Sequence, residues 1–472
     1  MSIDPSAPAL EPETAWLSLG EGYSDPVTPA DFPETILRFR NQRWAERVGL
    51  GALSDAEWIA HFGRFAPIPG SLPRPQAIRY HGHQFRVYNP EIGDGRGFLF
   101  AQLRDGPVGD PASRLLDFGT KGSGTTPYSR TADGRLTLKG GVREILATEM
   151  LEALGVYTSK AFSIIETGEA LMRGDEPSPT RSAVMVRLSH SHVRIGVFQR
   201  LAAEGDTARI AKLVDYVLRN LYRVEPEVDP AAQLLGLVVE RTADLAGSYM
   251  VAGFVHGVLN SDNINVTGES FDYGPWRFTP HWDARFTAAY FDHQGLYAFG
   301  RQAEAIHWDV AQLAMALRGM TETEPLVAQL ERFGDLYARA LVRRFLWRLG
   351  LMPADHEIAS PFVQAAVKAM IESGTEIDRF FHDWRGGAAP ARYDGAEWAA
   401  VHEQLAQFTP VPDARADPYW AGEPCSMHID EVETIWSAIA ERDDWRPLYD
   451  KVIATRAMGA ELGDIGAGGM NL

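Results

Sequence analysis

The segment that most constrains the fold is Val255–Pro275, which reads VHGVLNSDNINVTGESFDYGP. It holds two polar clusters, Asn260–Asn263 and Asp272–Gly274, on either side of a short stretch with apolar residues at Ile264 and Val266. This spacing predicts a strand between two loops, an arrangement that would hold two carboxylates and an amide close together. Oxygen ligands of this kind suit Mg²⁺, which binds a few carboxylates together with phosphate and water. The segment therefore indicates a site for a metal and a nucleotide.

The same segment matches the spacing of the protein-kinase catalytic loop except at the base. In that template an Asp follows the His by two residues, an Asn follows it by seven, and a DFG comes later. The Asp is the base, and the Asn and the DFG Asp hold metal. His256, Asn263 and Asp272 fit the template, whereas the base position falls on Val258. Valine cannot accept a proton, and Asp262 is the nearby carboxylate that could replace it.

Three interpretations of this loop remain open on the residues alone. The chain could be a kinase-like binding module without chemistry, or an enzyme that uses a nucleotide in an unusual way. In the third, the Asp and Asn residues only form turns. The turn interpretation explains one of the two clusters but explains poorly why both occur at this spacing.

The composition is that of an ordinary globular protein large enough for two lobes. The chain has 472 residues, of which 45% are hydrophobic and 23% are charged. No apolar run approaches the roughly 20 residues that a membrane-spanning helix needs, so we expect no membrane partner. The net charge of −18 argues against a nucleic-acid partner bound through its phosphates.

Cysteine content and the N-terminal residues bear on the compartment. Cys425 is the one cysteine, which excludes an intrachain disulfide and fits a reducing environment. The N-terminus shows no apolar region of the secretory type. The first basic residue is Arg38, which is atypical of an Arg-rich transit peptide. We therefore expect a cytoplasmic location.

The pattern along the chain changes from strand-like to helix-like. Residues 1–30 are rich in Pro, Ser, Asp and Glu and predict an extended or poorly ordered lead-in. Pro33 begins a predicted helix to about Val48, and short β-like runs follow over Ile78–Leu103. Helix-like apolar spacing dominates later, over Arg209–Val224, Pro230–Met250, Pro325–Leu349, Pro361–Ser373 and Ile429–Arg442. We expect an N-terminal extension over 1–78, a strand-rich lobe over 79–200 and a helical lobe over 201–472.

Two glycine-rich segments in the strand-like part are candidates for phosphate contact. In the turn Gly93–Gly97, glycines allow close approach of an anion and Arg96 can donate two hydrogen bonds to phosphate, although such a turn alone is more often a simple hairpin. The second segment places Lys121 ahead of Gly122–Gly124. A P-loop has its glycines before the lysine. We therefore interpret Lys121 as a strand lysine like the kinase lysine that meets the α- and β-phosphates.

A kinase lysine needs a glutamate on a helix as its partner, and the helix predicted over Val142–Leu154 offers Glu144. A lone Glu in a first turn is equally explained by the helix dipole, so this role depends on the other motifs. Arg187 and Arg194 lie in the apolar, strand-like run Ser182–Phe198. Arginines are expected in such a run where they meet an anion.

Taken together in order, these motifs resemble the selenoprotein O family of kinase-like protein adenylyltransferases. The matching segments are GDGRG, TKGSGTTPYSR with the following DGR, VREILATEMLEALG, VRLSHSHVRIGVF, HGVLNSDN, DYGP and DHQGLYAFGRQ, and they cover roughly residues 80–320. The resemblance implies a kinase-like two-lobed fold that binds ATP in a flipped orientation. AMP rather than phosphate would then pass to Ser, Thr or Tyr hydroxyls of protein substrates, and pyrophosphate would leave.

The resemblance also implies roles for individual residues. Asp262 would accept the proton, Glu144 would pair with Lys121, and Mg²⁺, or Mn²⁺ as the alternative, would be held by Asn263 and Asp272. A flipped nucleotide would explain Val258, because the base is then needed elsewhere. The residues implied to bind ATP are Gly93, Gly95, Arg96, Lys121, Asp133, Gly134, Arg187 and Arg194.

The chain departs from the family pattern at three places, one of which is the segment FTAAYFDH after Pro275, which lacks the cysteine common there. Ala132 stands where family members often have a turn glycine, and the C-terminal residues lack the redox cysteine or selenocysteine pattern. Two other functions remain as alternatives, a kinase-like phosphotransferase and a catalytically silent nucleotide-binding scaffold. Asp262 discriminates between enzyme and scaffold, because a scaffold has no use for a base beside a metal-binding Asn.

The single cysteine makes the redox behaviour of this chain testable. Because Cys425 has no partner for an intramolecular bridge, we expect activity to be unchanged by dithiothreitol or diamide. Rates measured on monomeric protein after each treatment check this. Strong activation by the reductant would contradict it.

Overall fold

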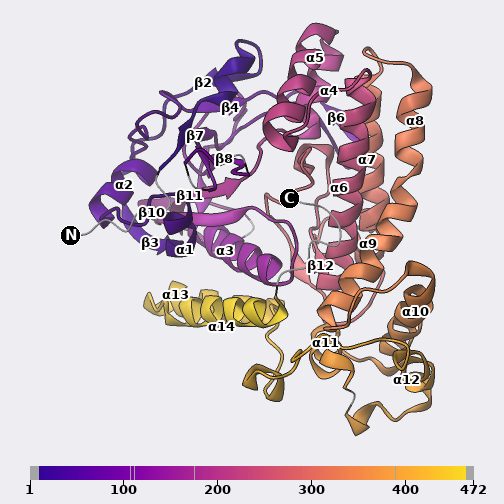
Figure 1. Ribbon diagram of the computed structural model, residues 1–472. Helices are drawn as coiled ribbons and strands as arrows, with labels where there is room; N and C mark the ends of the chain where they lie inside the picture. The colour runs from indigo at the N-terminus through magenta and orange to yellow at the C-terminus, as the bar shows by residue number, and fades with distance from the viewer. Residues whose placement is uncertain (1–9, 107, 111, 175, 389, 464–472) are drawn as a thin grey trace.

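The computed structural model describes residues 10–463 apart from residues 107, 111, 175 and 389 (Figure 1). The chain forms a strand-rich half and a helical half, which confirms the predicted α+β class with two lobes. In Figure 1 the strand-rich half is mostly indigo to purple, and the helical half is magenta to orange.

One nine-stranded antiparallel sheet forms the centre of the strand-rich half. Its main path runs in the order β2 (Ser24–Pro26), β4 (Gln76–Ile78), β7 (Leu99–Arg104), β8 (Leu115–Lys121), β11 (Thr180–Ser189), β10 (Lys160–Leu171) and β3 (Ile36–Arg40). Two shorter strands pair beside this path, β1 (Pro12–Glu13) with β7 and β9 (Leu136–Thr137) with β11. Residues 12–78, predicted as an extension, thus contribute β1 to β4 to the sheet.

Helices cover both faces of the sheet. Side chains alternate between the faces along each strand, and Phe118 of β8 and Val186 of β11 share an apolar cluster with Trp58. That cluster lies under α1 (Gln42–Arg47) and α2 (Asp55–Phe62). The opposite face of the sheet packs on α3 (Leu138–Ala153). The other side of α3 packs on the last two helices of the described chain.

The helical half is built around α6 (Pro230–Ala252). Asp229 caps this helix by accepting a hydrogen bond from the Ala232 amide, and Gly253 ends it in the left-handed conformation with φ of 67°. The helices of this half are α4 (Ile195–Ala203), α5 (Thr207–Tyr216), α7 (Gln302–Leu317), α8 (Thr323–Glu331), α9 (Phe333–Arg348), α10 (His356–Ser373), α11 (Ile377–Asp383) and α12 (Ala399–Leu405). α6 packs against α7, α8 and α9, and its apolar residues on all sides are buried.

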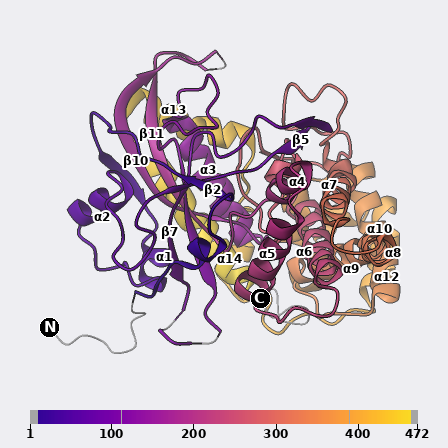
Figure 2. The same cartoon turned by 90° about the horizontal axis from the view of Figure 1, so that it is seen from above.

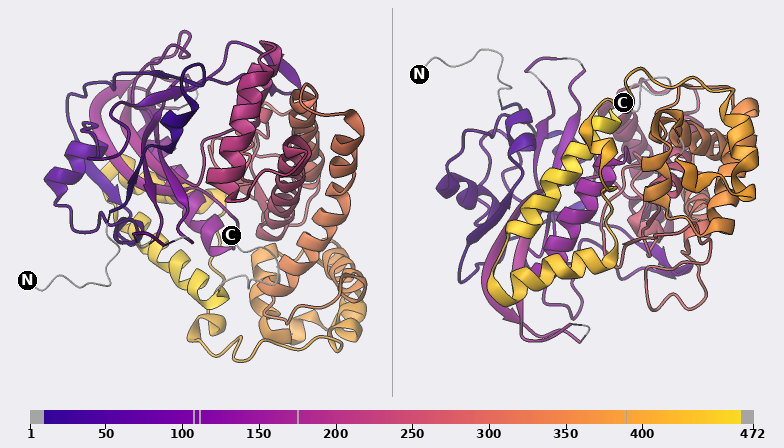
Figure 3. Two further views of the ribbon diagram at one scale, coloured as in Figure 1. Left: turned by 45° about the horizontal axis from the view of Figure 1, so that its top comes forward. Right: turned by 90° about the horizontal axis from the view of Figure 1, so that it is seen from below.

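The last two helices return to the strand-rich half. In Figure 3, α13 (Ile429–Arg442) and α14 (Arg446–Leu462), coloured yellow, lie across α3. The Lys139 ammonium of α3 contacts Glu433 of α13 at 2.7 Å, and Arg456 of α14 donates to Glu149 of α3 at 2.6 and 2.7 Å. The predicted range 201–472 therefore includes residues that pack on both halves, and the predicted domain boundaries stay a prediction.

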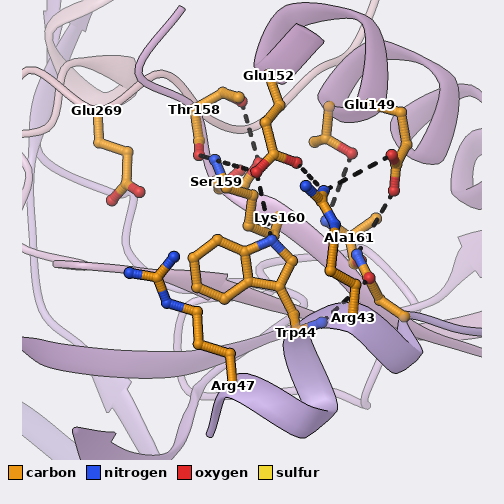
Figure 4. A network of polar contacts seen from close by, with 12 residues as sticks. Arg43, Trp44, Arg47, Glu149, Glu152, Thr158, Ser159, Lys160, Ala161 and Glu269 are labelled. Atoms are coloured by element: carbon orange, nitrogen blue, oxygen red, sulfur yellow. Dashed lines mark hydrogen bonds and ion pairs between the residues drawn. The ribbon is translucent and has the colours of Figure 1, made fainter. Parts of the chain in front are cut away.

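A polar network fixes the C-terminal end of α3 to the neighbouring elements (Figure 4). Glu149 and Glu152 point from α3 toward Arg43 and Trp44 of α1, and the Lys160 ammonium of β10 lies 3.6 Å from Glu152. Glu149 is buried, so its charge needs these partners and Arg456. The network holds α3 in one position against the sheet.

Three expectations about local structure are wrong. The helix predicted over Pro33–Val48 is instead β3 followed by the short α1, because β3 pairs with β10 at the sheet edge. Within the described part of residues 1–30, Trp16 and Tyr23 are buried and β1 and β2 are formed, so this part is ordered, while residues 1–9 lie outside the described residues. The predicted strand around Ile264 forms a single bridge between Asn265 and Arg194.

In the part of the chain that the structure describes, no helix combines the length and the apolar character that crossing a membrane would require.

The contact between α14 and α3 predicts a stability effect. Replacing Arg456 with Ala leaves the buried Glu149 carboxylate with poorer partners, so we expect a loss of roughly 1–3 kcal/mol in the free energy of unfolding. Urea unfolding followed by circular dichroism measures it. Arg446→Ala is the matched control, since Arg446 is exposed on the same helix and its ion pair is with Asp444 on the surface. Equal midpoints for the two variants would show that Arg456 does not hold α14 in place.

Candidate active site

A cavity of about 360 Å³ lies between the sheet and the start of the helical half. Its volume is within the usual range for sites that bind small molecules. Eight of the residues predicted from the sequence line it together, namely Gly93, Gly95, Arg96, Lys121, Arg187, Arg194, Asp262 and Asp272. Residues up to 179 positions apart are thus brought to one place, although their roles in catalysis stay predictions.

Sheet register places Lys121 and Arg187 on one face. Lys121 of β8 pairs with Met185 of β11, and Arg187 pairs with Gly119, so the two cations are diagonal neighbours on the face toward α3. Glu144, on α3 and 0% exposed, accepts from Lys121 at 2.6 Å and from Arg187 at 3.2 Å. The predicted contact between Lys121 and Glu144 is therefore present, and Arg187 shares the same carboxylate. Glu144 lies behind Lys121, outside the cavity lining.

Asp272 lies where three cations converge. Its carboxylate is 3.0 Å from the Lys121 ammonium and accepts hydrogen bonds from Arg187 at 3.2 Å and Arg194 at 3.1 Å. Asp272 has a φ of 65°, a left-handed conformation that Asp tolerates better than most residues. Burial would raise the pKa of this carboxyl, but Lys121, Arg187 and Arg194 hold it well below the usual range. Asp272 is therefore ionised at neutral pH.

Arg194 joins this carboxylate to the other polar cluster. Its Nη1 also donates to the backbone oxygen of Asp262 at 2.8 Å, and its guanidinium lies over the rings of Tyr80 and Phe271. Arg187 has a buried Nε without a hydrogen-bond partner among the described residues. A buried donor without a partner is costly, and an anionic oxygen in the cavity would satisfy it.

Asp262 lies in a short helical turn, η3 (Ser261–Asn263), and is almost completely buried. Burial raises the pKa of Asp262 to about 6, with Arg194 acting in the opposite direction. Its Oδ1 is buried without a hydrogen-bond partner in the described part of the chain. A carboxylate of this kind is largely ionised at neutral pH yet binds a proton more readily than an ordinary Asp, which suits a general base.

Asn263 and Asp272 fit the predicted metal role by the chemistry of their oxygens. The Asn263 amide donates from Nδ2 to the Val258 oxygen at 2.9 Å, which leaves Oδ1 as an acceptor. Among the described residues no group of three or more His, Cys, Asp or Glu side chains forms a ready metal cage. The oxygens of Asp272 and Asn263 are of the kind that suits Mg²⁺, which shares its ligands with phosphate and water.

His256 supports the loop rather than the chemistry. Its Nε2 lies 3.0 Å from the backbone oxygen of Phe271, next to Asp272. Burial lowers the pKa of His256, so the ring is neutral and Nε2 is the donor. Phe271 and Asp272 are thereby held on the inner side of the loop.

The glycine turn closes the cavity from the strand-rich half. A side chain at Gly93 would meet the Tyr128 ring at 2.5 Å, so only glycine fits there. Asp133 and Gly134 do not line this cavity. They line an adjacent hollow of about 370 Å³ that shares Arg96 with it, and the Asp133 carboxylate is paired with Arg173 at 2.8 Å.

Sequence reasoning missed several residues of this site. Asp94, between the two glycines of the turn, accepts from the Ile78 amide and lies 3.6 Å from Arg194. The position of Asp94 inside the motif GDGRG could have identified it as a residue of the site. Asp309 of α7 is buried, with Oδ2 unpartnered among the described residues, and the charge of Asp262 adds to the burial that raises its pKa. No local pattern indicated Asp309, because its environment arises from packing of α7 against η3.

The site thus combines a strand lysine with a carboxylate beside an Asn at a cavity of small-molecule size. A family model described as protein adenylyltransferase SelO matches residues 7–456. The chain therefore belongs to the SelO family of protein adenylyltransferases, and the resemblance inferred from the motifs is confirmed.

Several relatives carry the name protein nucleotidyltransferase YdiU. The protein from Synechocystis sp. is 41% identical over 94% of this chain and 96% of its own length. The protein from Gloeobacter violaceus is 43% identical over 94% of each chain. The protein from Azotobacter vinelandii is 33% identical over 77% of this chain and 73% of its own length.

The geometry predicts a division of labour between two carboxylates. In Asp272→Asn a metal ligand loses its charge, so we expect Mg²⁺ to stop strengthening ATP binding. Asp262→Asn should leave ATP binding unchanged and lower turnover roughly 10²–10⁴-fold if Asp262 is the base alone. Calorimetric ATP affinity, measured with Mg²⁺ and with EDTA, and a rate assay separate the two effects.

Asp215→Asn, on the surface of α5, is the control for general effects of removing a carboxylate. Equal loss of Mg²⁺-dependent ATP binding in Asp262→Asn and Asp272→Asn would reject the division of labour.

Proposed function

We propose that the protein transfers AMP from ATP to Ser, Thr or Tyr hydroxyls of other proteins and releases pyrophosphate. The observation that carries this proposal is the convergence of three cations at one end of the cavity, with a carboxylate of raised pKa at a separate position. Membership of the SelO family supports it. We further propose that the two halves correspond to the lobes of a kinase-like fold.

The cations favour pyrophosphate as the leaving group. Lys121, Arg187, Arg194 and Arg96 carry four positive charges against the carboxylates of Glu144, Asp272 and Asp94. The surplus suits the outer phosphates of ATP. If these phosphates occupy that end of the cavity, the α-phosphate is left toward Asp262. Charge developing on the departing pyrophosphate is then stabilised by groups already in place.

The transfer step moves one proton and exchanges one bond. The acceptor hydroxyl oxygen forms a bond to the α-phosphorus, and the bond from that phosphorus to the bridging oxygen of the β-phosphate breaks. Asp262 takes the hydroxyl proton, for which its burial and pKa of about 6 are suited. Val258 occupies the usual base position of a kinase, which disfavours transfer of the γ-phosphate by the ordinary route.

Asn263 and Asp272 would hold Mg²⁺, with Mn²⁺ as the alternative. The bound ion would neutralise phosphate charge and orient the phosphates. Arg96 and the backbone of Gly93 and Gly95 would bind the rest of the nucleotide from the strand-rich half, with Asp133 and Gly134 in the adjacent hollow.

We also propose a cytoplasmic location and protein rather than nucleic-acid acceptors. The net charge of −18 disfavours binding to a phosphate backbone. The single cysteine fits a reducing compartment.

Isotope labelling distinguishes transfer of AMP from transfer of phosphate. With ATP labelled at the α-phosphate we expect label on protein, and with γ-labelled ATP none, because pyrophosphate carries the γ-phosphate away. Lys121→Ala should abolish most of the signal, since it removes one cation from the phosphate end. Gel autoradiography and intact mass report the transferred group.

Lys368→Ala is the matched control, because Lys368 lies on the surface of α10 and pairs only with Glu372. Label arriving only from γ-labelled ATP would restore the phosphotransferase alternative. If neither labelled ATP gives labelled protein, the catalytically silent nucleotide-binding scaffold is the alternative that remains.

A further inference from the structure

A small hairpin from the strand-rich half lies on the helical half beside Asp262. It consists of β5 (Gly82–Gln84) and β6 (Val87–Asn89), which pair only with each other. Figure 2 shows β5 next to α4 and α7, away from the large sheet. The hairpin therefore belongs spatially to the candidate active site.

Hydrogen bonds attach this hairpin to the loop that carries Asp262. The His83 amide donates to Ser261 Oγ at 2.7 Å, and the Phe85 amide donates to Asn260 Oδ1 at 3.0 Å. Asn260 Oδ1 also accepts from the Tyr297 hydroxyl at 2.6 Å. The position of the hairpin and the position of Asp262 are thus coupled.

The turn of the hairpin is strained and contains no glycine. Phe85 and Arg86 form its two central positions in the left-handed region, with φ of 50° and 62°. Such turns strongly prefer Asn or Gly, because other residues resist this conformation. Strain of this kind is retained where the side chains have a use. The Phe85 ring packs on Tyr297 at 5.1 Å and meets Phe291 at 5.9 Å.

Apolar side chains from two segments form one exposed surface, which we call the hairpin surface. Tyr290 is 81% exposed and Val87 is 69% exposed. Ring contacts connect Tyr290 to Phe291 and Phe291 to Phe85. The hairpin surface consists of Phe85, Phe291 and Tyr290, which these ring contacts join, and of Val87, which is exposed two residues after Phe85. Contiguous exposed apolar residues are a mark of interaction sites in proteins.

The hairpin surface is continuous with the opening of the cavity. Gln84, at the end of β5, lines the cavity together with Asp262. A side chain at Gly82 would come within 2.9 Å of Asp262 Cβ, so the hairpin backbone touches the candidate base directly. Residues that flank an acceptor hydroxyl at Asp262 would therefore lie close to this hairpin.

Two arginines lie beside the hairpin surface with two carboxylates, Glu304 and Asp292, and both carboxylates raise the pKa of Arg301. Arg86 contacts Glu304 at 2.9 Å, and Arg301 contacts the same carboxylate at 3.1 Å. Arg86 also lies over the Trp308 ring. Recognition at this surface would therefore depend on apolar contact more than on charge, as at other interfaces rich in aromatic residues.

We propose that the hairpin surface is the docking site for the acceptor protein, and that it selects segments with apolar residues beside the hydroxyl to be modified. This inference rests on the proposed transfer to protein hydroxyls. The hairpin surface binds the flanking residues, and its hydrogen bonds to Asn260 and Ser261 position Asp262 relative to the docked hydroxyl.

A pair of synthetic peptides tests this docking site. Both peptides carry a central Ser-Thr-Tyr segment and have equal length and charge. They differ only in the residues on each side of this segment, which are Leu in one peptide and Asn in the other. With α-labelled ATP we expect the full-length protein to prefer the Leu peptide. In the double variant Val87→Asp and Tyr290→Asp, kcat/KM for the Leu peptide should fall about tenfold, mainly through KM, because binding contacts are lost.

ATP affinity measured by calorimetry should be unchanged in the double variant, which separates docking from nucleotide binding. Val228→Asp is the control, since Val228 is a fully exposed valine in the loop before α6. Equal labelling of both peptides by the unmodified protein, or equal kcat/KM in the double variant, would overturn the docking site alone. An equal fall in Val228→Asp would overturn it as well.

Absence of label on either peptide and on the protein itself, despite normal ATP binding, would overturn the transfer activity and the docking site together.

Discussion

The structure depends on how one partly buried carboxylate, Asp272, is paired. Three cations that reach it come from separate elements, Lys121 from β8, Arg187 from β11 and Arg194 from the residue before α4. Buried charges are tolerated only when they are paired, so this contact ties the sheet to the loop of the helical half. Glu144 on α3 accepts hydrogen bonds from Lys121 and Arg187 and so belongs to the same group of charges. The polar centre thus lies where the two halves meet, and its three cations and Asp272 line the cavity.

The surrounding fold keeps that group in position. α3 carries Glu144 and is held on one side by the sheet and on the other by α13 and α14. On the helical side, α6 leads directly into the loop with Asp262, and β5 and β6 attach to the same loop from outside. Asp262, the cations around Asp272 and the exposed hairpin surface are therefore connected through one loop.

Sequence patterns predicted best the elements with strong local signals. The helix over Ile429–Arg442 was predicted with its observed bounds, and the helix from Pro230 was predicted within two residues of its end. Prediction failed for Ile36–Arg40, where pairing with β10 overrides a helix-like apolar pattern. It failed also around Ile264, where the chain has no neighbouring strand to form a ladder.

The sequence by itself determined the chemistry that is available to this protein. The spacing of Asn263 and Asp272, valine at position 258 and the single cysteine could all be read directly. Only the tertiary structure decided which charges meet, that Asp262 is buried enough for a pKa of about 6, and that Phe85 and Tyr290 lie beside it on one exposed surface. The physical reason is that burial and charge pairing depend on residues far apart in the chain, and local patterns do not specify which of these come into contact.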